Sequence, residues 1–347
     1  MGDELRGENL VHLNVRFSTE TELKKIQDFL YEKSGQGVSF TGLVEAMANE
    51  VTIVTAVHNI KSNKGSRTAG VDKIKMDKYL QMPKDELILL IQSSFRNYRP
   101  KPARREYIEK SNGKKRPLGI PTVLDRIIQE CVRIIIEPIC EARFYPQSYG
   151  FRPYRAQKHA IRGIINVINA GCKSPDQPVW AIEGDIKGCF DNINHRLLLQ
   201  KLWRIGIHDK RVLKIISQML KAGYMENDLF HATELGTPQG GIISPILANI
   251  YLHELDKFVE NLKEEFDKPS KEKYTPEYRK AKYQTEKARK AIRECDPQDY
   301  ERKKQLIKNY LSAVERVLLD IDGNSSKLTQ SAFFEAIFKV FDEACSF

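Results

Sequence analysis

The sequence predicts an α+β fold, because helical and extended patterns follow one another in an irregular order rather than as repeated strand–helix units. Residues 1–60 show mostly helical spacing of apolar residues, whereas residues 100–122 alternate and turn like a β-hairpin. Residues 179–186 form an apolar run of strand length between two helical stretches. These three observations together indicate the fold class.

Five helices are expected from their start signals. The run Ser18-Thr19-Glu20-Thr21-Glu22 resembles a helix start, and a second helix is expected over about residues 41–60. The other three begin at residues that favour a first helical turn, and we expect them at about 122–142, 194–202 and 244–255. Residues 61–70 are polar and contain glycine, which is typical of a loop.

The composition indicates a soluble protein of about two domains. Of the 347 residues, 41% are hydrophobic and 29% are charged, and the mean hydropathy is −0.47. There is no run of about 18 apolar residues, and the first residues lack the layout of a secretory signal. We therefore expect a cytoplasmic protein with no membrane partner. None of its six cysteines forms a C-x-x-C pair, so we expect reduced, mostly buried thiols.

The net charge of +10 is concentrated in one segment. Residues 61–116 hold 16 Lys or Arg against 6 Asp or Glu, so the remainder of the chain is neutral on balance. Such a segment favours binding to a polyanion, because lysine and arginine displace counterions from phosphates. The alternative is a solvated charged face. A second basic stretch, residues 271–310, holds 13 Lys or Arg against 7 acids and is expected to be helical.

The first motif with chemical content is the segment from Ala181 to Asp191, in which an apolar run is followed by Asp185. A carboxylate at the end of a strand, followed by a glycine-containing turn, is lifted to the rim of the sheet. Carboxylate and carbonyl oxygens suit Mg²⁺, so Asp185 and the carbonyl of Ile186 are a candidate half-site. The alternative is that Asp185 or Asp191 only caps the following helix.

The second motif is the run of small and cyclic residues from Gly236 to Pro245. Its two adjacent glycines allow a backbone to approach a flat substrate, and Gln239 can contact the sugar or base of a nucleotide. An ordinary turn before a helix is the alternative.

A third motif is the hairpin, where Lys110 and Arg116, facing each other across the turn, could clamp a triphosphate. Taken singly, each is more often a solvated surface charge.

These three segments resemble, in order, conserved blocks of reverse transcriptases, and the wording is closest to the group II intron kind. Two further segments add to the resemblance, Asn63–Asp72 and Gln147–Pro153. It covers about residues 20–320. It implies the fingers and palm of a right-hand polymerase, with a helical N-terminal extension and a basic helical insertion. The implied divisions are 1–60 for the extension, 61–165 for the fingers, 166–256 for the palm core, and 257–347 for the insertion and palm end.

The resemblance also implies roles for individual residues. Asp185 would be catalytic and would hold Mg²⁺ with Ile186, in a two-metal mechanism of nucleotide transfer. The nucleotide-binding residues would be Lys110, Arg116, Phe190, Gln239 and Gly240. Phe190 would be the gate against ribonucleotides, with a core aromatic as the alternative. RNA would bind the cationic side chains Lys61, Lys64, Arg67, Lys114 and Lys115. The implied partners are group II intron RNA, an RNA template with a DNA primer, and dNTPs; a homodimer is left open.

One departure concerns the third palm motif of the family, an aromatic-x-Asp-Asp hairpin. Nothing after Leu255 has this pattern, and Asp320-Ile321-Asp322 lies in a turn-like context. We therefore expect an RNA-directed DNA polymerase by family whose 347 residues are inactive alone. One alternative is a non-catalytic RNA-binding splicing cofactor that uses the same fold as a scaffold. Another is a retron-type reverse transcriptase.

Overall fold

The computed structural model describes residues 9–63, 65–109, 113, 115–171, 183–227, 229–237 and 240–267, with isolated positions between 280 and 309. The chain divides into two compact units, Met1–Phe258 and Val259–Phe347. In the second unit the isolated positions, such as Lys280, Lys287 and Arg302, are helical. The rest of the expected basic insertion lies outside the described residues.

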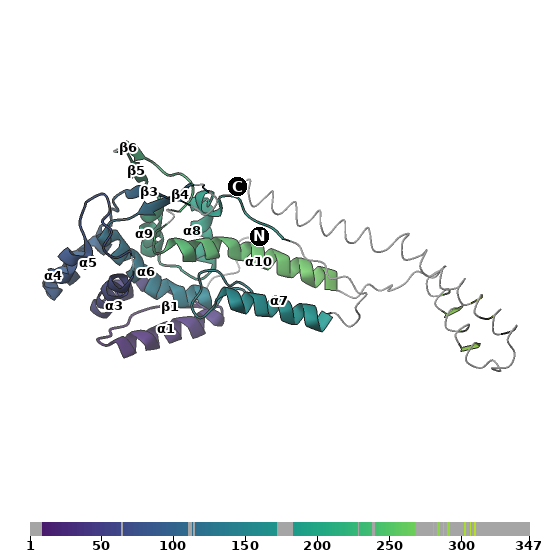
Figure 1. Ribbon diagram of the computed structural model, residues 1–347. Helices are drawn as coiled ribbons and strands as arrows, with labels where there is room; N and C mark the ends of the chain where they lie inside the picture. Colours follow the sequence, from purple (N-terminus) through teal and green to yellow (C-terminus); the bar gives the residue numbers. More distant parts are fainter. Residues whose placement is uncertain are drawn as a thin grey trace. The chain divides into compact units, whose positions relative to one another are not determined.

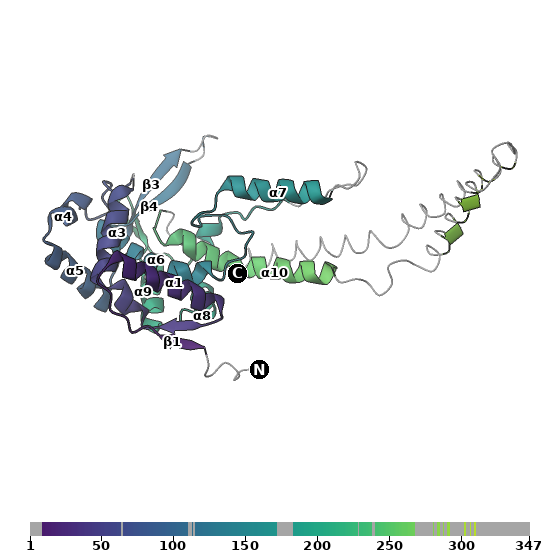
Figure 2. The ribbon, with the colours of Figure 1, turned by 90° about the horizontal axis from the view of Figure 1, so that it is seen from below.

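The first unit is built around one long buried helix, α6 (Val123–Glu141). Thr122 caps it by accepting the backbone N–H of Asp125, as the sequence predicts. Helices α1 (Glu20–Gly35), α2 (Leu43–Met47), α3 (Glu50–Ser62) and α5 (Lys84–Arg96) pack against α6. Figures 1 and 2 show α1 and α3 beside α6 in both views. One hydrophobic core therefore joins the N-terminal residues to the middle of the chain.

The N-terminal region is helical, as expected, but it also contains two short strands. Strand β1 (Leu10–His12) pairs in parallel with β2 (Ser39–Thr41). Thr19 and Glu22 form a capping box at the start of α1, which confirms the predicted helix start. The single helix expected over residues 41–60 is wrong. The chain is extended at Asn49, whose side chain accepts the Val51 N–H and starts α3 anew.

The predicted hairpin is present as β3 (Ala103–Glu109) and β4 (Lys115–Ile120). These strands are antiparallel and project from the helices, as Figure 2 shows. Strand β5 (Tyr224–Glu226) adds in parallel to β3, and β6 (Leu229–His231) closes the sheet in the order β4-β3-β5-β6. Helices and a mixed sheet together confirm the α+β class.

The remaining helices are α4 (Met76–Gln81), α7 (Gln157–Gly171), α8 (His195–Arg204), α9 (Lys210–Leu220) and α10 (Ser244–Asp267). Asn194 caps α8 by accepting the Leu197 N–H, as predicted. Helix α10 begins at Ser244 as expected but continues well past Leu255. Within the described ranges, no helix is long and apolar enough to cross a membrane.

The buried strand expected over residues 179–186 is not found where the structure describes it. Glu183, Gly184 and Asp185 are exposed, and residues 183–186 have no strand partner among the described residues. A strand is stabilised by hydrogen bonds to a neighbouring strand, so an apolar pattern alone does not produce one. Residues 179–182 lie outside the described ranges.

Cys131 and Cys140 lie fully buried in α6 as free thiols, as expected. Burial raises the pKa of both thiols, so they stay protonated and unreactive at neutral pH. Cys189 is half-buried and is likewise not part of a disulfide bond.

His253 on α10 gives the stability of this unit a dependence on pH. Its ring lies edge-on to Phe144, with centroids 5.8 Å apart, and burial, with the charge of Lys257, lowers its pKa to about 4. The unfolded chain binds a proton near pH 6.5, so stability contributed by neutral His253 is present above that pH and is lost as pH falls toward 4. From pH 7 to pH 5 the loss is expected to be about 1–2 kcal/mol.

The measurement compares urea denaturation of the wild-type chain and of His253→Asn at both pH values. The variant should lose less stability over this interval, because asparagine does not titrate. Equal losses in the two proteins would show that His253 is not the group responsible.

Candidate functional site

The segment around Asp185 leads into a tight turn rather than a sheet. Gly188 has a left-handed backbone, with φ 63°, and precedes the short 3₁₀ helix η1 (Cys189–Asp191). The backbone N–H of Asp191 donates to the Gly188 carbonyl at 2.9 Å. Glycine is favoured at Gly188 because a side chain strains this conformation. Asp185 is exposed, three residues before this turn.

Gly236 holds the second motif directly against this turn. It has a φ of 85°, and a Cβ at this position would lie 2.8 Å from the Asp191 carbonyl oxygen. The next residue, Thr237, donates its backbone N–H to the Phe190 carbonyl at 2.8 Å. The Gly236 N–H donates to the Ile193 carbonyl, also at 2.8 Å. Only glycine permits this approach, so the first and second motifs are in direct backbone contact.

Gly240 brings the second motif onto the base of the hairpin. Its φ is 114°, and an added Cβ would lie 2.6 Å from the Gly119 carbonyl oxygen and 2.8 Å from a methyl carbon of Leu118. The Ile242 N–H donates to Oε1 of Gln129 on α6 at 2.8 Å. Residues 236–242 therefore join the turn after Asp185, the hairpin and the central helix. Gln239 itself lies outside the described residues.

Phe190 lies between the turn and residues 147–153. Its ring meets the ring of Phe151 edge to face, with centroids 6.3 Å apart, and its other side packs partly on the core. Next to Phe151, the Gly150 carbonyl accepts the side-chain amide of Asn249 from α10 at 2.8 Å. The half-buried ring agrees with both readings of Phe190, so the gate against ribonucleotides stays a prediction.

Of the two cations expected to face each other on the hairpin, the structure describes Arg116. Arg116 is exposed and lies opposite Ile108 in the β3–β4 ladder. At the end of the ladder nearest the turn, Glu109 pairs with Lys115. Lys110 lies outside the described residues. Whether Arg116 contacts a triphosphate remains a prediction.

The basic loop of residues 63–72 is held against the start of α6 by an arginine that the sequence analysis did not single out. Arg126 donates to the carbonyl of Gly65 at 2.8 Å and to that of Thr68. A Cβ on Gly70 would lie 2.7 Å from the Thr122 Cα, so the loop contacts α6 directly. The signal in the sequence that could have indicated this role is an arginine within the apolar stretch of the helix expected at about 122–142. Of the cations proposed for RNA, Lys61, Arg67 and Lys115 are exposed, and Lys64 and Lys114 lie outside the described residues.

A small cavity lies beside these contacts. It has a volume of about 380 Å³ and is lined by Arg105 and Pro117 from the hairpin, Asp191 from the turn, and Thr237. The guanidinium of Arg105 lies 3.7 Å from the ring centroid of Tyr224 on β5. Thr237 is 4% exposed, and its hydroxyl has no hydrogen-bond partner among the described residues. The cavity thus presents one cation and one uncommitted hydroxyl between two motifs.

Comparison with known proteins identifies the arrangement. Residues 108–271 match the reverse transcriptase (RNA-dependent DNA polymerase) family. The group II intron-encoded protein LtrA of Lactococcus lactis subsp. cremoris is 46% identical over 241 residues, covering 69% of this chain and 39% of LtrA. An uncharacterized 91 kDa protein in the cob intron of Schizosaccharomyces pombe is 38% identical over 288 residues, covering 80% of this chain and 34% of that protein. The chain belongs to the group II intron reverse transcriptases.

This reverse transcriptase chain spans about two fifths of LtrA and a third of the fission yeast protein. Among solved structures, a chain of a partial Cas6-RT-Cas1–Cas2 complex has a TM-score of 0.41 and 20% identity. That comparison covers 72% of this chain and 42% of the other, a likeness too low for a structural argument.

Reverse transcriptases generally use Mg²⁺, but the described residues do not form a complete site for it. Asp185 is one exposed carboxylate, and the part of the chain that the structure describes holds no group of three His, Cys, Asp or Glu that could bind a metal ion. Two divalent ions need several carboxylate oxygens. The described residues therefore do not make up a two-metal centre by themselves.

Proposed function

We propose that this chain is the fingers and palm part of an intron reverse transcriptase and that it binds RNA. The N-terminal extension would comprise residues 1–60, the fingers 61–165, the palm core 166–256, and the basic insertion and palm end 257–347. What supports the proposal most is the contact between the motifs. Gly236 lies against the turn after Asp185, and Gly240 lies against the hairpin. Three segments far apart in sequence thus meet at one place, and this convergence supports the proposal.

The proposed roles follow from this convergence. Asp185 and the Ile186 carbonyl would hold Mg²⁺, which when bound would polarise the phosphate and activate the primer hydroxyl. Arg116 and Lys110 would bind the triphosphate, and Phe190, Gln239 and Gly240 would line the sugar pocket. The backbone N–H of Thr237 donates to the Phe190 carbonyl and so helps to hold Phe190 in place, and positioning is the contribution that these residues would make.

The RNA side of the proposal rests on exposed cations around the hairpin and the preceding loop. Lys61, Arg67 and Lys115 are exposed and free to reach phosphates. By similarity to a group II intron-encoded protein, the RNA would be an intron, and the whole protein would assist splicing and intron mobility by reverse transcription. A non-catalytic splicing cofactor is the second candidate, because the described residues form no group of three possible metal ligands.

The test is primer extension with Mg²⁺ and dNTPs, beside an RNA-binding assay on the same preparation. The 347-residue chain should bind RNA and should not extend a primer, because one carboxylate cannot offset the charge of two divalent ions. Asp185→Ala should leave RNA binding unchanged, and so should the neighbouring control Glu183→Ala.

Two results would contradict this reading in different ways. Templated extension that Asp185→Ala abolishes and Glu183→Ala preserves would show that these residues already hold a complete polymerase centre. A folded chain that binds no RNA would remove the basis for both candidate functions.

A further inference from the structure

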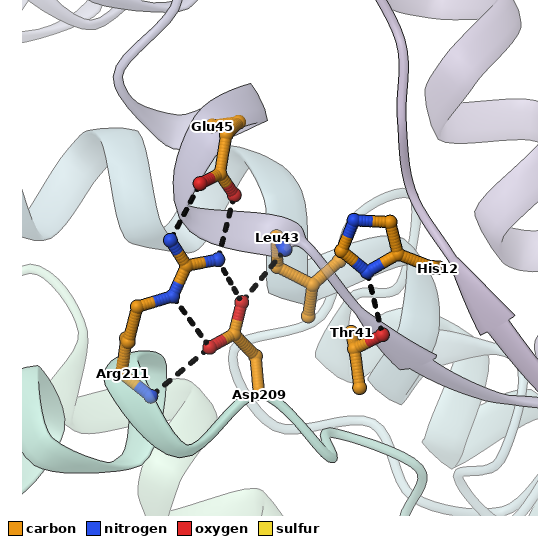
Figure 3. A network of polar contacts seen from close by, with 6 residues as sticks. All are labelled: His12, Thr41, Leu43, Glu45, Asp209 and Arg211. Atoms are coloured by element: carbon orange, nitrogen blue, oxygen red, sulfur yellow. Dashed lines mark hydrogen bonds and ion pairs between the residues drawn. The ribbon is translucent and has the colours of Figure 1, made fainter.

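A second polar cleft lies apart from the polymerase motifs. It has a volume of about 900 Å³ and is lined by residues 14–16 before α1, by α2, by the end of α5 and by α9. It shares no lining residue with the turn after Asp185, the hairpin or the second motif. One of its walls is the polar network in Figure 3, where Arg211 lies between Glu45 and Asp209.

The cleft carries cations that no acidic side chain among the described residues neutralises. Its two acids are already engaged, Glu45 by Arg211 and Glu50 by Lys84. Arg16, Arg96 and Lys214 also line it, and all three are exposed and make no ion pair among the described residues. They come from three different elements and converge on one space. Because these three side chains carry like charges, they repel one another, and an anionic ligand would reduce that repulsion.

Uncommitted amides accompany these cations. The side chains of Asn14, Asn97 and Gln218 line the same cleft and make no hydrogen bond to other described residues. An amide both donates and accepts, so it can pair with a phosphate oxygen or with a sugar hydroxyl. Arginine matches phosphate through its planar fork, whereas lysine acts as a point charge. This set of side chains suits a chain of phosphates and hydroxyls.

The wall in Figure 3 is rigid before any ligand arrives. Asp209 is 4% exposed and accepts the Leu43 N–H at 2.9 Å and the Arg211 N–H at 3.0 Å, which ties α2 to the start of α9. Lys214 and Gln218 lie one and two turns further along α9. Their backbone is therefore held in place relative to α2, which lowers the entropy cost of binding.

We propose that this cleft binds the sugar–phosphate backbone of a folded RNA, as a site separate from the polymerase motifs. The choice of RNA over other polyanions rests on the proposed function. Contacts of this kind position an RNA without reading its sequence. The 2′-hydroxyls of RNA would pair with the amides, so RNA should bind more tightly than DNA of the same sequence.

The test uses a triple variant, Arg16→Gln, Arg96→Gln and Lys214→Gln, in the whole 347-residue chain. The probe is a structured RNA, with a single-stranded DNA of the same sequence beside it. A matched control, Lys24→Gln, Lys25→Gln and Arg162→Gln, removes the same charge from exposed positions on α1 and α7. The cleft variant should bind RNA at least about tenfold more weakly than the control, with a salt slope smaller by about two to three.

Urea denaturation of each variant establishes that these exposed substitutions leave the fold intact. Equal RNA affinity of the cleft variant and the control would overturn the proposal while leaving the proposed function standing. So would a cleft variant that loses binding to polyglutamate rather than to RNA, because the occupant would then be an acidic protein. A wild-type chain that binds no RNA would overturn both, and this outcome is visible before any variant is made.

Discussion

Replacing Asp209 with alanine is expected to lower the free energy of unfolding by about 3 kcal/mol, a large share of the stability of a typical domain. The carboxylate caps α9, and it accepts the Leu43 N–H from a residue 166 positions earlier. The substitution removes a helix cap, at about 1 kcal/mol, and leaves a buried N–H without a partner, at about 1–3 kcal/mol.

The electrostatic interactions of Asp209 also indicate that its carboxylate stabilises the fold. Burial would raise the pKa of its carboxyl, but hydrogen bonds from Arg211 and Leu43 outweigh burial, and the net pKa is lowered. The ionised form therefore stabilises the fold above the ordinary carboxyl pKa, and this contribution is lost as pH falls through the lowered value. Arg211 is half-exposed and keeps Glu45 as a partner, so its charge is not left buried.

The measurement is the urea midpoint of Asp209→Ala beside that of Glu45→Ala. The control removes the other carboxylate that Arg211 contacts, with a side chain 57% exposed, and should cost no more than about 1 kcal/mol. Asp209→Asn should fall between the two, because it keeps one oxygen acceptor. If alanine at 209 and at 45 cost the same, the buried cap does not hold the N-terminal residues to α9.

Local signals in the sequence predict the parts of this fold that depend on contacts between residues close together in the sequence. Thr19, Thr122 and Asn194 each cap a helix through an N–H three residues away, so residue type and spacing suffice. The hairpin follows from alternation around Gly113, for the same reason. Asn49 carried an equally local cap signal, and a polar residue inside an apolar run could have indicated the break before α3.

Contacts between distant segments had no such signal. The approach of Gly236 to Asp191 and the network of Asp209 and Arg211 join segments that only the folded backbone brings together. The apolar run before Asp185 shows the reverse problem, because a strand pattern needs a partner strand to form. The adjacent glycines at 240 and 241 predict an approach to a flat substrate, which stays a prediction; the approach that the structure has is that of Gly240 to the hairpin.

The second large effect is expected in the salt dependence of RNA binding. Each phosphate that a lysine or arginine neutralises adds close to one to the log–log slope of affinity against salt. The surplus of ten positive charges within residues 61–116 makes a slope of several units the expected value. With about six contacts, affinity should fall by roughly a thousandfold between 50 and 200 mM salt.

Substitutions of individual cations identify which side chains contribute to this salt dependence. Lys61→Gln with Arg67→Gln should weaken binding to RNAs of different sequence alike, because phosphate contacts carry little sequence information. The matched pair Lys24→Gln with Arg162→Gln removes the same charge elsewhere and should leave the slope nearly unchanged.

The most direct test of the account is therefore the affinity of the wild-type chain for a structured RNA, measured at several salt concentrations in one buffer. We expect a steep linear fall of log affinity with log salt, with a slope of several units. An affinity that stays constant between 50 and 200 mM salt would contradict it, because binding would then not depend on the cations around the hairpin.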